Sequence, residues 1–376
     1  MRKICYISGT RADFGLMKNT LQIINKDKDL DLEIIVTGMH LLSEYGNTCQ
    51  EIYDAGLNVI SKVKVELSGI SGSQMSIALG NQIIGITSTL EKSKPDLVLL
   101  LGDRGEMLAG AIASLHLNIP IVHIHGGELS GTIDESVRHS ISKMAHYHFT
   151  ATNNSKDRLI KMGEIKGNIF VTGAPGLDEI RGTQLIPKEV LLKQYGIDRK
   201  KPFVLLLFHP VVQQTNDINE QIAIIMESLF FYNIQILALM PNADSGGKVI
   251  SSILKGYQEQ QKIKTAVHLT RLNFLSLVSE AEVLVGNSSS GIIEAASLGT
   301  PVVNIGSRQN LRERSNNVVD VSIEKSKIIS GISKAMSLNK SLFKNVYGDG
   351  ESSKRIVNLL KGLDLNPKIL DKVNAY

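Results

Sequence analysis

The chain has 376 residues, more than one hydrophobic core usually organises, so we expect two domains. Its 43% hydrophobic and 21% charged residues are typical of a globular protein, and 41 basic against 37 acidic residues leave too small an excess to indicate a nucleic-acid partner. The presence of only two cysteines, Cys5 and Cys49, fits a reducing compartment, and the lack of a Cys-x-x-Cys pair argues against a structural zinc site. The start lacks a signal peptide and no apolar run could span a bilayer, so we expect a cytoplasmic protein without a membrane partner.

Short apolar runs alternate with segments of helical period along the first half of the chain. The runs predict strands at Lys3–Ser8, Leu32–Thr37, Leu97–Gly102 and Ile121–His125. The segments between them predict helices at Gly15–Lys26, from about Leu41, at Glu106–Leu117 and at Asp134–Ala145. Near-continuous apolar strands need both faces covered, as in a parallel sheet, so the alternation predicts a doubly wound α/β layer structure.

The pattern pauses at a Gly- and Pro-rich segment, residues 171–176, and then restarts. Further strands are predicted at Phe203–Phe208, Ile234–Leu239, Ala266–Leu269, Val283–Gly286 and Val302–Ile305, and a last helix at Ser352–Gly362. The whole pattern predicts two Rossmann-like domains that face a cleft. Residues 1–172 form the first, residues 173–354 form the second, and a C-terminal helical stretch at 355–376 completes the first. Ligands of open parallel sheets bind beyond the carboxyl ends of the strands, so residues directly after each strand are the site candidates.

Two loops of the first half place charges at such strand ends. Residues 8–15, Ser-Gly-Thr-Arg-Ala-Asp-Phe-Gly, combine glycines, a helix start that favours an anion and the forked cation of Arg11, although a plain strand–helix turn fits them equally well. Asp103 and Arg104 follow the strand at Leu97–Gly102. Asp103 could cap the next helix, whereas Arg104 opposes the helix dipole unless an anion lies beside it.

Acidic, basic and imidazole side chains concentrate in residues 122–148, which include His123, His125, Glu128, Asp134, Glu135, Arg138, His139, His146 and His148. Strand alternation puts His123 and His125 on the same face. His-x-His is a pattern of metal ligands, but no recognised set of further ligands accompanies it. An acid/base cluster is therefore favoured over a metal, since close carboxylates and imidazoles shift one another's pKa values. Asp134 and Glu135 open the next helix, so one of them is expected to cap it.

In the second half, His209 lies at a strand end and is stiffened by Pro210. The loop at 241–246 follows another strand and contains Asn242 and Asp244; a ligand loop and a bare loop fit it equally well.

A serine-rich turn gives the strongest anion signal of the chain. Ser288 and Ser289 join the strand at Val283–Gly286 to a helix, where hydroxyls and free N–H groups can cradle a phosphate without lysine. Glu294 lies about one turn further on, where it could reach ribose hydroxyls or act as a capping carboxylate. Arg308 follows yet another strand, and together with the arginines of the first half it predicts a diphosphate ligand.

Taken in order, these segments resemble the hydrolysing UDP-N-acetylglucosamine 2-epimerases of sialic acid synthesis, including the epimerase domain of the bifunctional animal enzyme. The resemblance covers nearly the whole chain and rests on residues 9–13, 36–40, 45–48, 102–104, 127–132, 138–139, 209–210, 241–244, 286–289 and 306–309. It implies a glycosyltransferase-B type fold with UDP held mainly by the second domain, and neither a cofactor nor a metal. The family reaction is an anti elimination of UDP to a 2-acetamidoglucal, followed by addition of water to give N-acetylmannosamine.

The resemblance also implies roles for single residues. Diphosphate binding falls to Arg11, Arg104, Ser288, Ser289 and Arg308, with His209 close by as a further catalytic candidate. Ribose binding falls to Glu294, and Asp103 and Asp134 match the catalytic carboxylates. Contacts with the sugar or its loops are expected from His40, Arg138, Asn242 and Asp244.

The chain departs from many family members at His125, where they have a glutamate. Other bacterial enzymes of sialic acid synthesis share the histidine form. The second acid/base is therefore either His125 itself or Glu128, and an imidazole is competent near neutral pH.

Alternative hypotheses about the function differ in the substrate or in the class of reaction. The nearest has the same chemistry on UDP-2,4-diacetamido-2,4,6-trideoxyglucose, on the route to legionaminic acid. A non-hydrolysing epimerase would return UDP-N-acetylmannosamine, a glycosyltransferase would need an acceptor, and a sugar-nucleotide sensor would bind without turnover. Fold alone does not separate these classes. A UDP-sugar is the expected partner in most of them, and the resemblance implies a homodimer or homotetramer.

Overall fold

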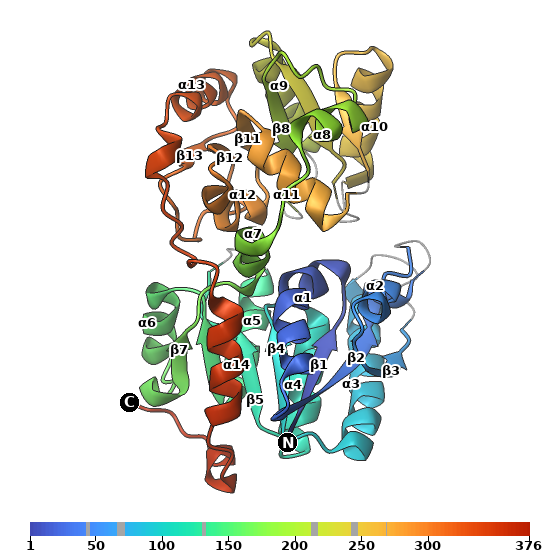
Figure 1. Cartoon of the computed structure of the whole chain (residues 1–376), viewed down its shortest axis with the longest axis vertical. Coiled ribbons are helices and arrows are strands. Elements are labelled where there is room, and N and C mark those ends of the chain that lie inside the picture. The colour runs from blue at the N-terminus through green and yellow to red at the C-terminus, as the bar shows by residue number, and fades with distance from the viewer. Residues whose placement is uncertain (43–45, 66–71, 130–132, 212–216, 242–246, 268) are drawn as a thin grey trace. The chain divides into compact units, whose positions relative to one another are not determined.

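The computed structural model describes residues 1–42, 46–65, 72–129, 133–211, 217–241, 247–267 and 269–376. Packing divides the chain into two compact units. The first consists of Met1–Glu179 together with Tyr347–Tyr376, and the second of Ile180–Val346. The boundaries expected after residues 172 and 354 differ from those of the units, which fall after Glu179 and Val346. Each unit is an α/β structure built on one sheet (Figure 1).

The sheet of the first unit has seven parallel strands in the order β3-β2-β1-β4-β5-β6-β7. Their bounds are β1 Arg2–Ser8, β2 Leu30–Thr37, β3 Val59–Val63, β4 Leu97–Leu101, β5 Ile121–Ile124, β6 Tyr147–Thr150 and β7 Ile169–Val171. The strand order reverses direction between β1 and β4, which pair in register at Cys5 and Val98. Such a reversal opens a crevice at the carboxyl ends of the two strands.

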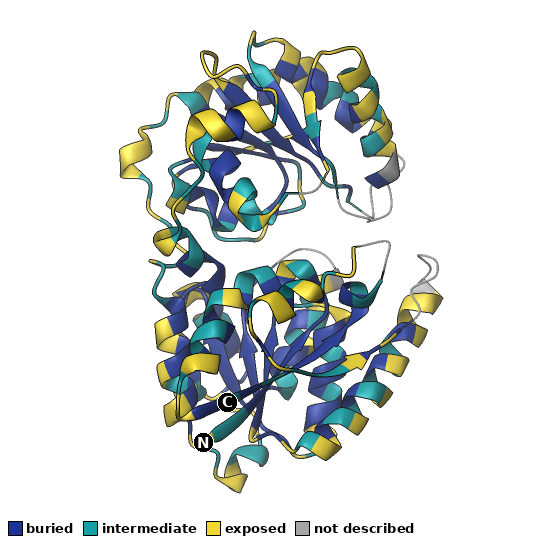
Figure 2. Cartoon of the chain, turned by 45° about the vertical axis from the view of Figure 1, so that its right-hand side comes forward, coloured by how far each residue is buried: buried dark blue, intermediate teal, exposed yellow. Residues whose placement is uncertain are grey.

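Helices cover both faces of this sheet, because its strands carry apolar residues on both sides. Ile4 and Tyr6 of β1 belong to the core beneath the first and last helices, whereas Cys5 and Ile7 pack on the opposite face. The strands β4, β5 and β6 are buried throughout and the edge strands β3 and β7 are partly exposed, while the outer faces of the helices are exposed (Figure 2). The helices are α1 Arg11–Lys26, α2 Gln50–Asp54, α3 Gly72–Ser93, α4 Gly105–His116, α5 Ile133–Met144, α6 Asn153–Lys161 and α14 Ser352–Gly362. The short helix α7, Asp178–Gly182, contains the point in the sequence where the first unit passes into the second.

Helix α14 returns from the far end of the chain to complete the first unit. It lies against α1, where the hydroxyls of Thr20 and Ser353 are 2.8 Å apart (Figure 1). The Asp178 carboxylate accepts the Ser352 backbone N–H at the start of the helix, at 2.9 Å. Just beyond its end, the Arg2 side chain donates to the Leu363 carbonyl at 2.8 Å. Both ends of the chain therefore belong to one unit.

The second unit repeats the design with six parallel strands in the order β10-β9-β8-β11-β12-β13. The strands are β8 Phe203–Leu207, β9 Gln235–Leu239, β10 Lys264–Ala266, β11 Val283–Gly286, β12 Val302–Ile305 and β13 Val318–Val321. The helices are α8 Lys188–Gln194, α9 Ile218–Phe230, α10 Gly247–Glu259, α11 Arg271–Glu280, α12 Ser289–Ile293 and α13 Lys325–Met336. Val204 and Leu206 face one core, Leu205 and Leu207 face the other, and the strand order reverses between β8 and β11.

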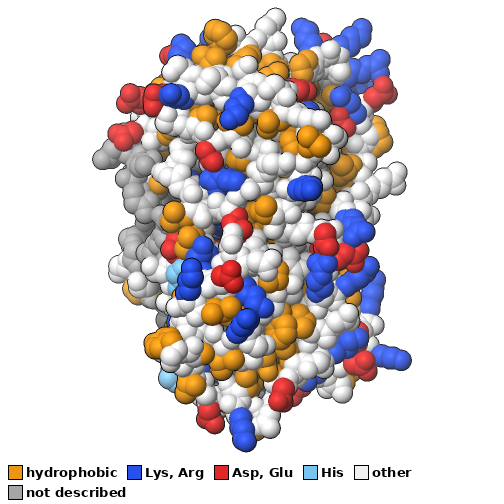
Figure 3. Space-filling model, turned by 90° about the vertical axis from the view of Figure 1, so that its left-hand side faces the viewer, with side chains coloured by type: hydrophobic (Ala, Val, Ile, Leu, Met, Phe, Trp, Pro, Cys, Tyr) orange, Lys and Arg blue, Asp and Glu red, His pale blue; other side chains and the backbone are white. Residues whose placement is uncertain are grey.

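The surface carries charges of both signs. On the face drawn in Figure 3, blue and red side chains are interspersed with orange apolar ones, without an extended area of one sign. Among the residues that the structure describes, no helix is long and apolar enough to cross a membrane.

Candidate active site

The loop after β1 places a buried carboxylate at the reversal of the first sheet. Thr10 caps α1, and the Asp13 carboxylate accepts the backbone N–H groups of Gly9 at 3.0 Å and of Thr10 at 2.6 Å. Burial raises the pKa of Asp13 to about 6, against hydrogen bonds from Ser8 and Thr10 that favour the charged form. The N–H groups that the sequence offered to an anion are thus taken by the protein's own side chain. Arg11 is half-buried and pairs with Glu51 through Nε at 2.8 Å.

Glu106 fills the space between the β1 and β2 loops. A Cβ on Gly9 would lie 2.6 Å from its Cγ, and one on Gly38, whose φ is +58°, would lie 2.6 Å from Oε1. Only glycines permit this approach. Arg104, not Asp103, occupies the N-cap position of α4, without a side-chain capping bond. It donates from Nε to Glu106 Oε2 at 3.3 Å, and this carboxylate raises the pKa of Arg104. Glu106 thus supplies the anion that a cation at a helix start requires, and the Arg104 side chain remains 49% exposed.

His40 is completely buried. Its Nε2 lies 3.0 Å from the Ser8 hydroxyl and its Nδ1 2.8 Å from the Thr48 hydroxyl, and burial lowers its pKa to about 4. Both ring nitrogens have protein partners, so the ring connects the end of β1 at Ser8 to the segment at Thr48.

The two histidines of the His-x-His pattern occupy different environments. His123 lies inside β5 with Nδ1 3.0 Å from the Ser142 hydroxyl and Nε2 2.7 Å from the Gly102 carbonyl, and burial lowers its pKa to about 3. The neutral His123 ring is therefore hydrogen-bonded to the Gly102 carbonyl, directly before Asp103. His125 lies beyond the strand end with a left-handed backbone, φ +63°, so strand alternation does not extend to it. Such a conformation is uncommon in a non-glycine residue and persists where the surrounding structure holds it.

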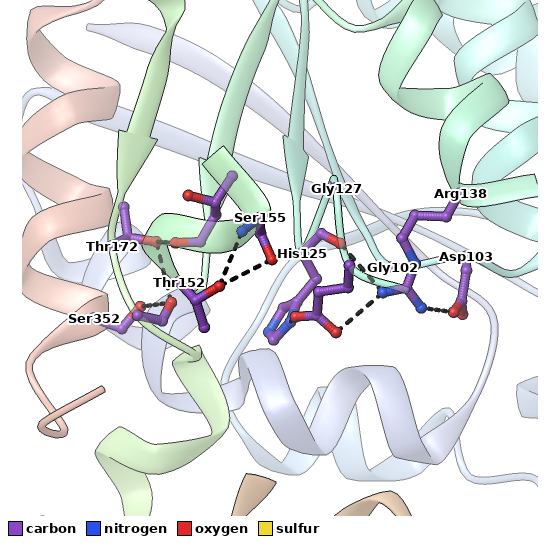
Figure 4. A network of polar contacts seen from close by, with 12 residues as sticks. Gly102, Asp103, His125, Gly127, Arg138, Thr152, Ser155, Thr172 and Ser352 are labelled. Carbon is purple, nitrogen blue, oxygen red and sulfur yellow. Dashed lines mark hydrogen bonds and ion pairs between the residues drawn. The ribbon is translucent and has the colours of Figure 1, made fainter. Parts of the chain in front are cut away.

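Asp103, His125, Glu128 and Arg138 form one connected cluster. The Arg138 side chain is 2% exposed and donates from Nη2 to Asp103 Oδ2 and from Nη1 to Glu128 Oε2, the latter at 3.0 Å. His125 Nδ1 is hydrogen-bonded to Glu128 Oε1. Figure 4 shows the Arg138 guanidinium between Asp103 and the His125 segment. The cluster brings together three of the expected acid/base residues and an arginine expected near the sugar.

Asp134 lies in the first turn of α5 and is exposed, and Arg138 follows one turn later on the same helix. Asp134 adds to the charge that raises the pKa of Arg104, after the larger effect of Glu106. Asp134 is therefore a third candidate carboxylate, after Asp103 and Glu128, on the side of the sheet where the strands end.

In the second unit, Asn287 organises the reversal between β8 and β11. Its side chain accepts the His209 backbone N–H at 2.7 Å and donates to the His209 carbonyl at 2.8 Å. Its own carbonyl accepts Arg308 Nη1 at 3.1 Å and Gln309 Nε2 at 3.0 Å. One buried amide residue thus ties His209 and Arg308 to a single strand end.

The serine turn follows directly. Ser288 caps α12, its hydroxyl accepting the Ser290 N–H at 3.3 Å, and Ser289 is half-buried. Glu294 is buried and pairs with Arg271 Nη2 at the start of α11. Ser288, Ser289, Glu294 and Arg308 are thereby gathered at the carboxyl edge of one sheet.

Some residues at these edges had no role in the expectations from sequence: Asp13, Glu106, Arg271 and Asn287. Asp13 and Asn287 lie within motifs already singled out and Glu106 begins a predicted helix, but Arg271 lies in neither. A cation in the first turn of a helix is the same signal that marks Arg104, and it applies to Arg271 equally. Asn242 and Asp244 lie outside the described residues. Within the described ranges, no group of three acidic, His or Cys side chains could hold a metal ion.

A family model described as UDP-N-acetylglucosamine 2-epimerase matches residues 22–361. The chain belongs to this family. A relative from Legionella pneumophila, UDP-N,N'-diacetylbacillosamine 2-epimerase (hydrolyzing), is 48% identical over 376 residues, all of both chains. UDP-N-acetylglucosamine 2-epimerase from Neisseria meningitidis serogroup B is 35% identical over 94% of this chain and 92% of its own.

A solved structure of UDP-GlcNAc 2-epimerase from Neisseria meningitidis, bound to UDP-GlcNAc, is 20% identical and matches with a TM-score of 0.81, over 96% of this chain and all of that one. The expected glycosyltransferase-B-like α/β fold is thus confirmed. The chain is an enzyme of the hydrolysing UDP-sugar 2-epimerase kind.

Proposed function

We propose that this enzyme acts on UDP-2,4-diacetamido-2,4,6-trideoxyglucose, the compound also named UDP-N,N'-diacetylbacillosamine, and releases UDP and 2,4-diacetamido-2,4,6-trideoxymannose. One observation carries the choice of sugar: the full-length identity of 48% to the relative named for that compound, against 35% to the relative named for UDP-N-acetylglucosamine. The sugar first expected from the resemblance, UDP-N-acetylglucosamine, is the second candidate, and the 35% relative supports it.

The reaction requires a base for the C2 proton, stabilisation of the leaving diphosphate and an acid/base pair for hydration. The C2–H bond and the C1–O bond to UDP break as a C1=C2 double bond forms. Water then adds across the double bond: its hydroxyl group bonds to C1, and a proton bonds to C2 on the face opposite to the one from which the first proton was removed. We assign the proton transfers to Asp103, His125 and Asp134.

The second unit supplies nucleotide binding in this proposal. Arg308, Ser288 and Ser289 contact the diphosphate, Glu294 accepts the ribose hydroxyls, and His209 lies close to the phosphates. Their gathering at one sheet edge supports the assignment, because ligands of parallel sheets bind at such edges. Arg11 and Arg104 of the first unit add cations for the leaving group.

Product analysis by NMR in deuterated water tests the proposal. Purified enzyme is given each UDP-sugar separately, without an acceptor. Free UDP and C2-deuterated diacetamido-trideoxymannose, formed with a kcat/KM at least about tenfold above that for UDP-N-acetylglucosamine, are expected. Faster formation of N-acetylmannosamine would move the assignment to sialic acid synthesis, and retention of UDP on the epimerised sugar would refute hydrolysis.

A homodimer or homotetramer remains a prediction from the resemblance, and a cytoplasmic location remains a prediction from the sequence. Light scattering coupled to size exclusion tests the first, and cell fractionation tests the second.

A further inference from the structure

Two carboxylates share the buried guanidinium of Arg138. Glu128 is as deeply buried as the arginine, while the Asp103 side chain is 21% exposed. Buried charges of this kind persist only when they are paired and hydrogen-bonded. The guanidinium is well suited to the task, because its fork can face two acceptors in one plane, which a lysine ammonium cannot reproduce.

The partners of this guanidinium come from separate parts of the sheet edge. Asp103 follows β4, whereas His125 and Glu128 follow β5, and Arg138 itself projects from α5. Arg138 Nη1 also lies 3.4 Å from the His125 carbonyl, the residue with the left-handed backbone. Arg138 thus holds both loops at once (Figure 4).

The His125 ring is oriented by Glu128. An ionised carboxylate on Nδ1 fixes the proton on that nitrogen, which leaves the lone pair on Nε2 to accept a proton. A protonated Glu128 could instead donate to Nδ1, and Nε2 would then carry the proton and could not act as a base. The charge of Glu128 therefore decides which nitrogen of His125 is reactive, by the same logic that makes the wrong tautomer harmful in a catalytic triad.

We propose that Arg138 is a positioning residue that couples Asp103 to the His125–Glu128 pair: it keeps both carboxylates ionised and so holds His125 in the tautomer with a free Nε2. It acts through these residues without touching the substrate, because its own side chain is buried. The proposal deepens the proposed function and rests on the family reaction, whichever UDP-sugar is the substrate.

Other charged groups described around the cluster have contacts of their own. Arg158 of α6 donates to the Gly127 carbonyl, and Arg104 pairs with Glu106. His139 of α5 pairs with Glu135 at 3.7 Å, and neighbouring His123 is held neutral by burial. The exposed carboxylate of Asp134 adds negative charge one turn before Arg138. Among the contacts described, Arg138 is the cation bound to both Asp103 and Glu128.

Steady-state kinetics of Arg138→Met, Arg138→Lys and Glu128→Gln test the coupling, with Arg199→Met, which removes an exposed ion pair to Glu189, as the control. We expect Arg138→Met to lower kcat by about 10- to 100-fold with KM within about threefold, and Arg138→Lys to recover part of the loss. In Arg138→Met, the acid limb of the pH profile of kcat should move to higher pH, because carboxylates without a nearby cation bind protons more readily. Arg138→Met/Glu128→Gln should be no slower than the slower single variant, as expected for residues that act as one unit.

A spectroscopic measurement separates positioning from a general loss of structure. Long-range 1H–15N spectra of histidine-labelled protein report the tautomer, with His125 identified by its loss in His125→Gln. The Nδ1–H tautomer is expected in the native enzyme and in Arg199→Met, and its loss in Arg138→Met.

An unchanged His125 tautomer in a folded Arg138→Met variant, or a rise in KM at constant kcat, would overturn the proposal. The kinetics use whichever UDP-sugar the native enzyme turns over, so turnover of UDP-N-acetylglucosamine alone would refute only the proposed substrate. The tautomer measurement needs no turnover and decides the inference by itself.

Discussion

The Asn287 side chain closes a two-way hydrogen-bonded clamp on the backbone of His209, accepting its N–H at 2.7 Å and donating to its carbonyl at 2.8 Å. The clamp ties the ends of β8 and β11 together at the point where the strand order of the second sheet reverses. Its removal tests how far the geometry of this edge depends on one amide.

Asn287→Ala is expected to destabilise the second unit by about 1–3 kcal/mol, because a partly buried N–H and carbonyl of His209 lose their partner. UDP should also bind about tenfold more weakly, since the Asn287 side chain positions His209, whereas the backbone carbonyl that accepts from Arg308 is retained. Thermal unfolding and titration calorimetry with UDP measure the two effects. Asn316→Ala is the matched control: it also loses two backbone hydrogen bonds, to Leu342 and Lys344, but at an exposed loop. Equal effects of both changes on UDP affinity would contradict the prediction.

Gly286→Ala should be severe. The glycine has φ +143°, and an added Cβ would lie 2.0 Å from the Leu207 carbonyl oxygen of the neighbouring strand. We expect a loss on the order of 3 kcal/mol or more in the free energy of unfolding, measured by denaturant titration. Gly256→Ala within α10 has open space around the new methyl group and should instead stabilise by about 0.5–1 kcal/mol. A mild effect at Gly286 would mean that β8 and β11 separate more easily than their register implies.

The buried His40 predicts a pH dependence of stability. Its pKa in the folded protein, about 4, lies below the usual 6.5, so the unfolded chain binds the proton first. Its contribution to the free energy of unfolding is therefore complete above pH 6.5 and falls as the pH is lowered toward 4, by up to about 1.4 kcal/mol per pH unit. His40→Gln should flatten this part of the stability curve, whereas the exposed His116→Gln should leave its slope unchanged. A slope identical in all three proteins would rule out His40 as a source.

Arg271→Met is expected to weaken UDP binding by about tenfold through Glu294. Without the ion pair, the buried Glu294 carboxylate loses the cation that holds it in place. Arg271→Lys should retain part of the affinity, and Arg314→Met, which removes a pair with Asp320 in the same unit, should retain all of it. Titration calorimetry with UDP alone measures the affinity of each variant. An unchanged affinity in Arg271→Met would show that UDP binding does not depend on the position of Glu294.

Most strands of the two sheets could be predicted because their apolar runs are nearly continuous. The strand at Val283–Gly286 has the expected bounds, and β8 differs from the expected Phe203–Phe208 by one residue. Strand β6 has no such run, since His148 lies within it and becomes acceptable in a core only through the hydrogen bond to Glu164. The helix expected from about Leu41 begins instead at Gln50, and the strand expected at Ala266–Leu269 ends at Ala266.

The candidate site was predicted as a set of residues but not as a set of contacts. Charges after β4 and β5 identify the loops, because strand ends are local features of the sequence. Which carboxylate accepts which donor depends on neighbours far along the chain. Asp13 takes backbone N–H groups that could have served a ligand, and Arg138 is buried beneath the site, because helices α1 and α5 pack where they do. Neither the contacts of Asp13 nor the burial of Arg138 can be predicted from the spacing of residues in a motif.

Helix α14 imposes an order on folding during synthesis. The second unit is one continuous segment, Ile180–Val346, and it can fold as soon as it leaves the ribosome. The first unit must wait, with the surface of α1 that α14 will cover still open to water, until Ser352–Gly362 has been made. A chain that stalls late in translation would thus present a finished second unit beside an unfinished first one, whose α1 surface is still exposed.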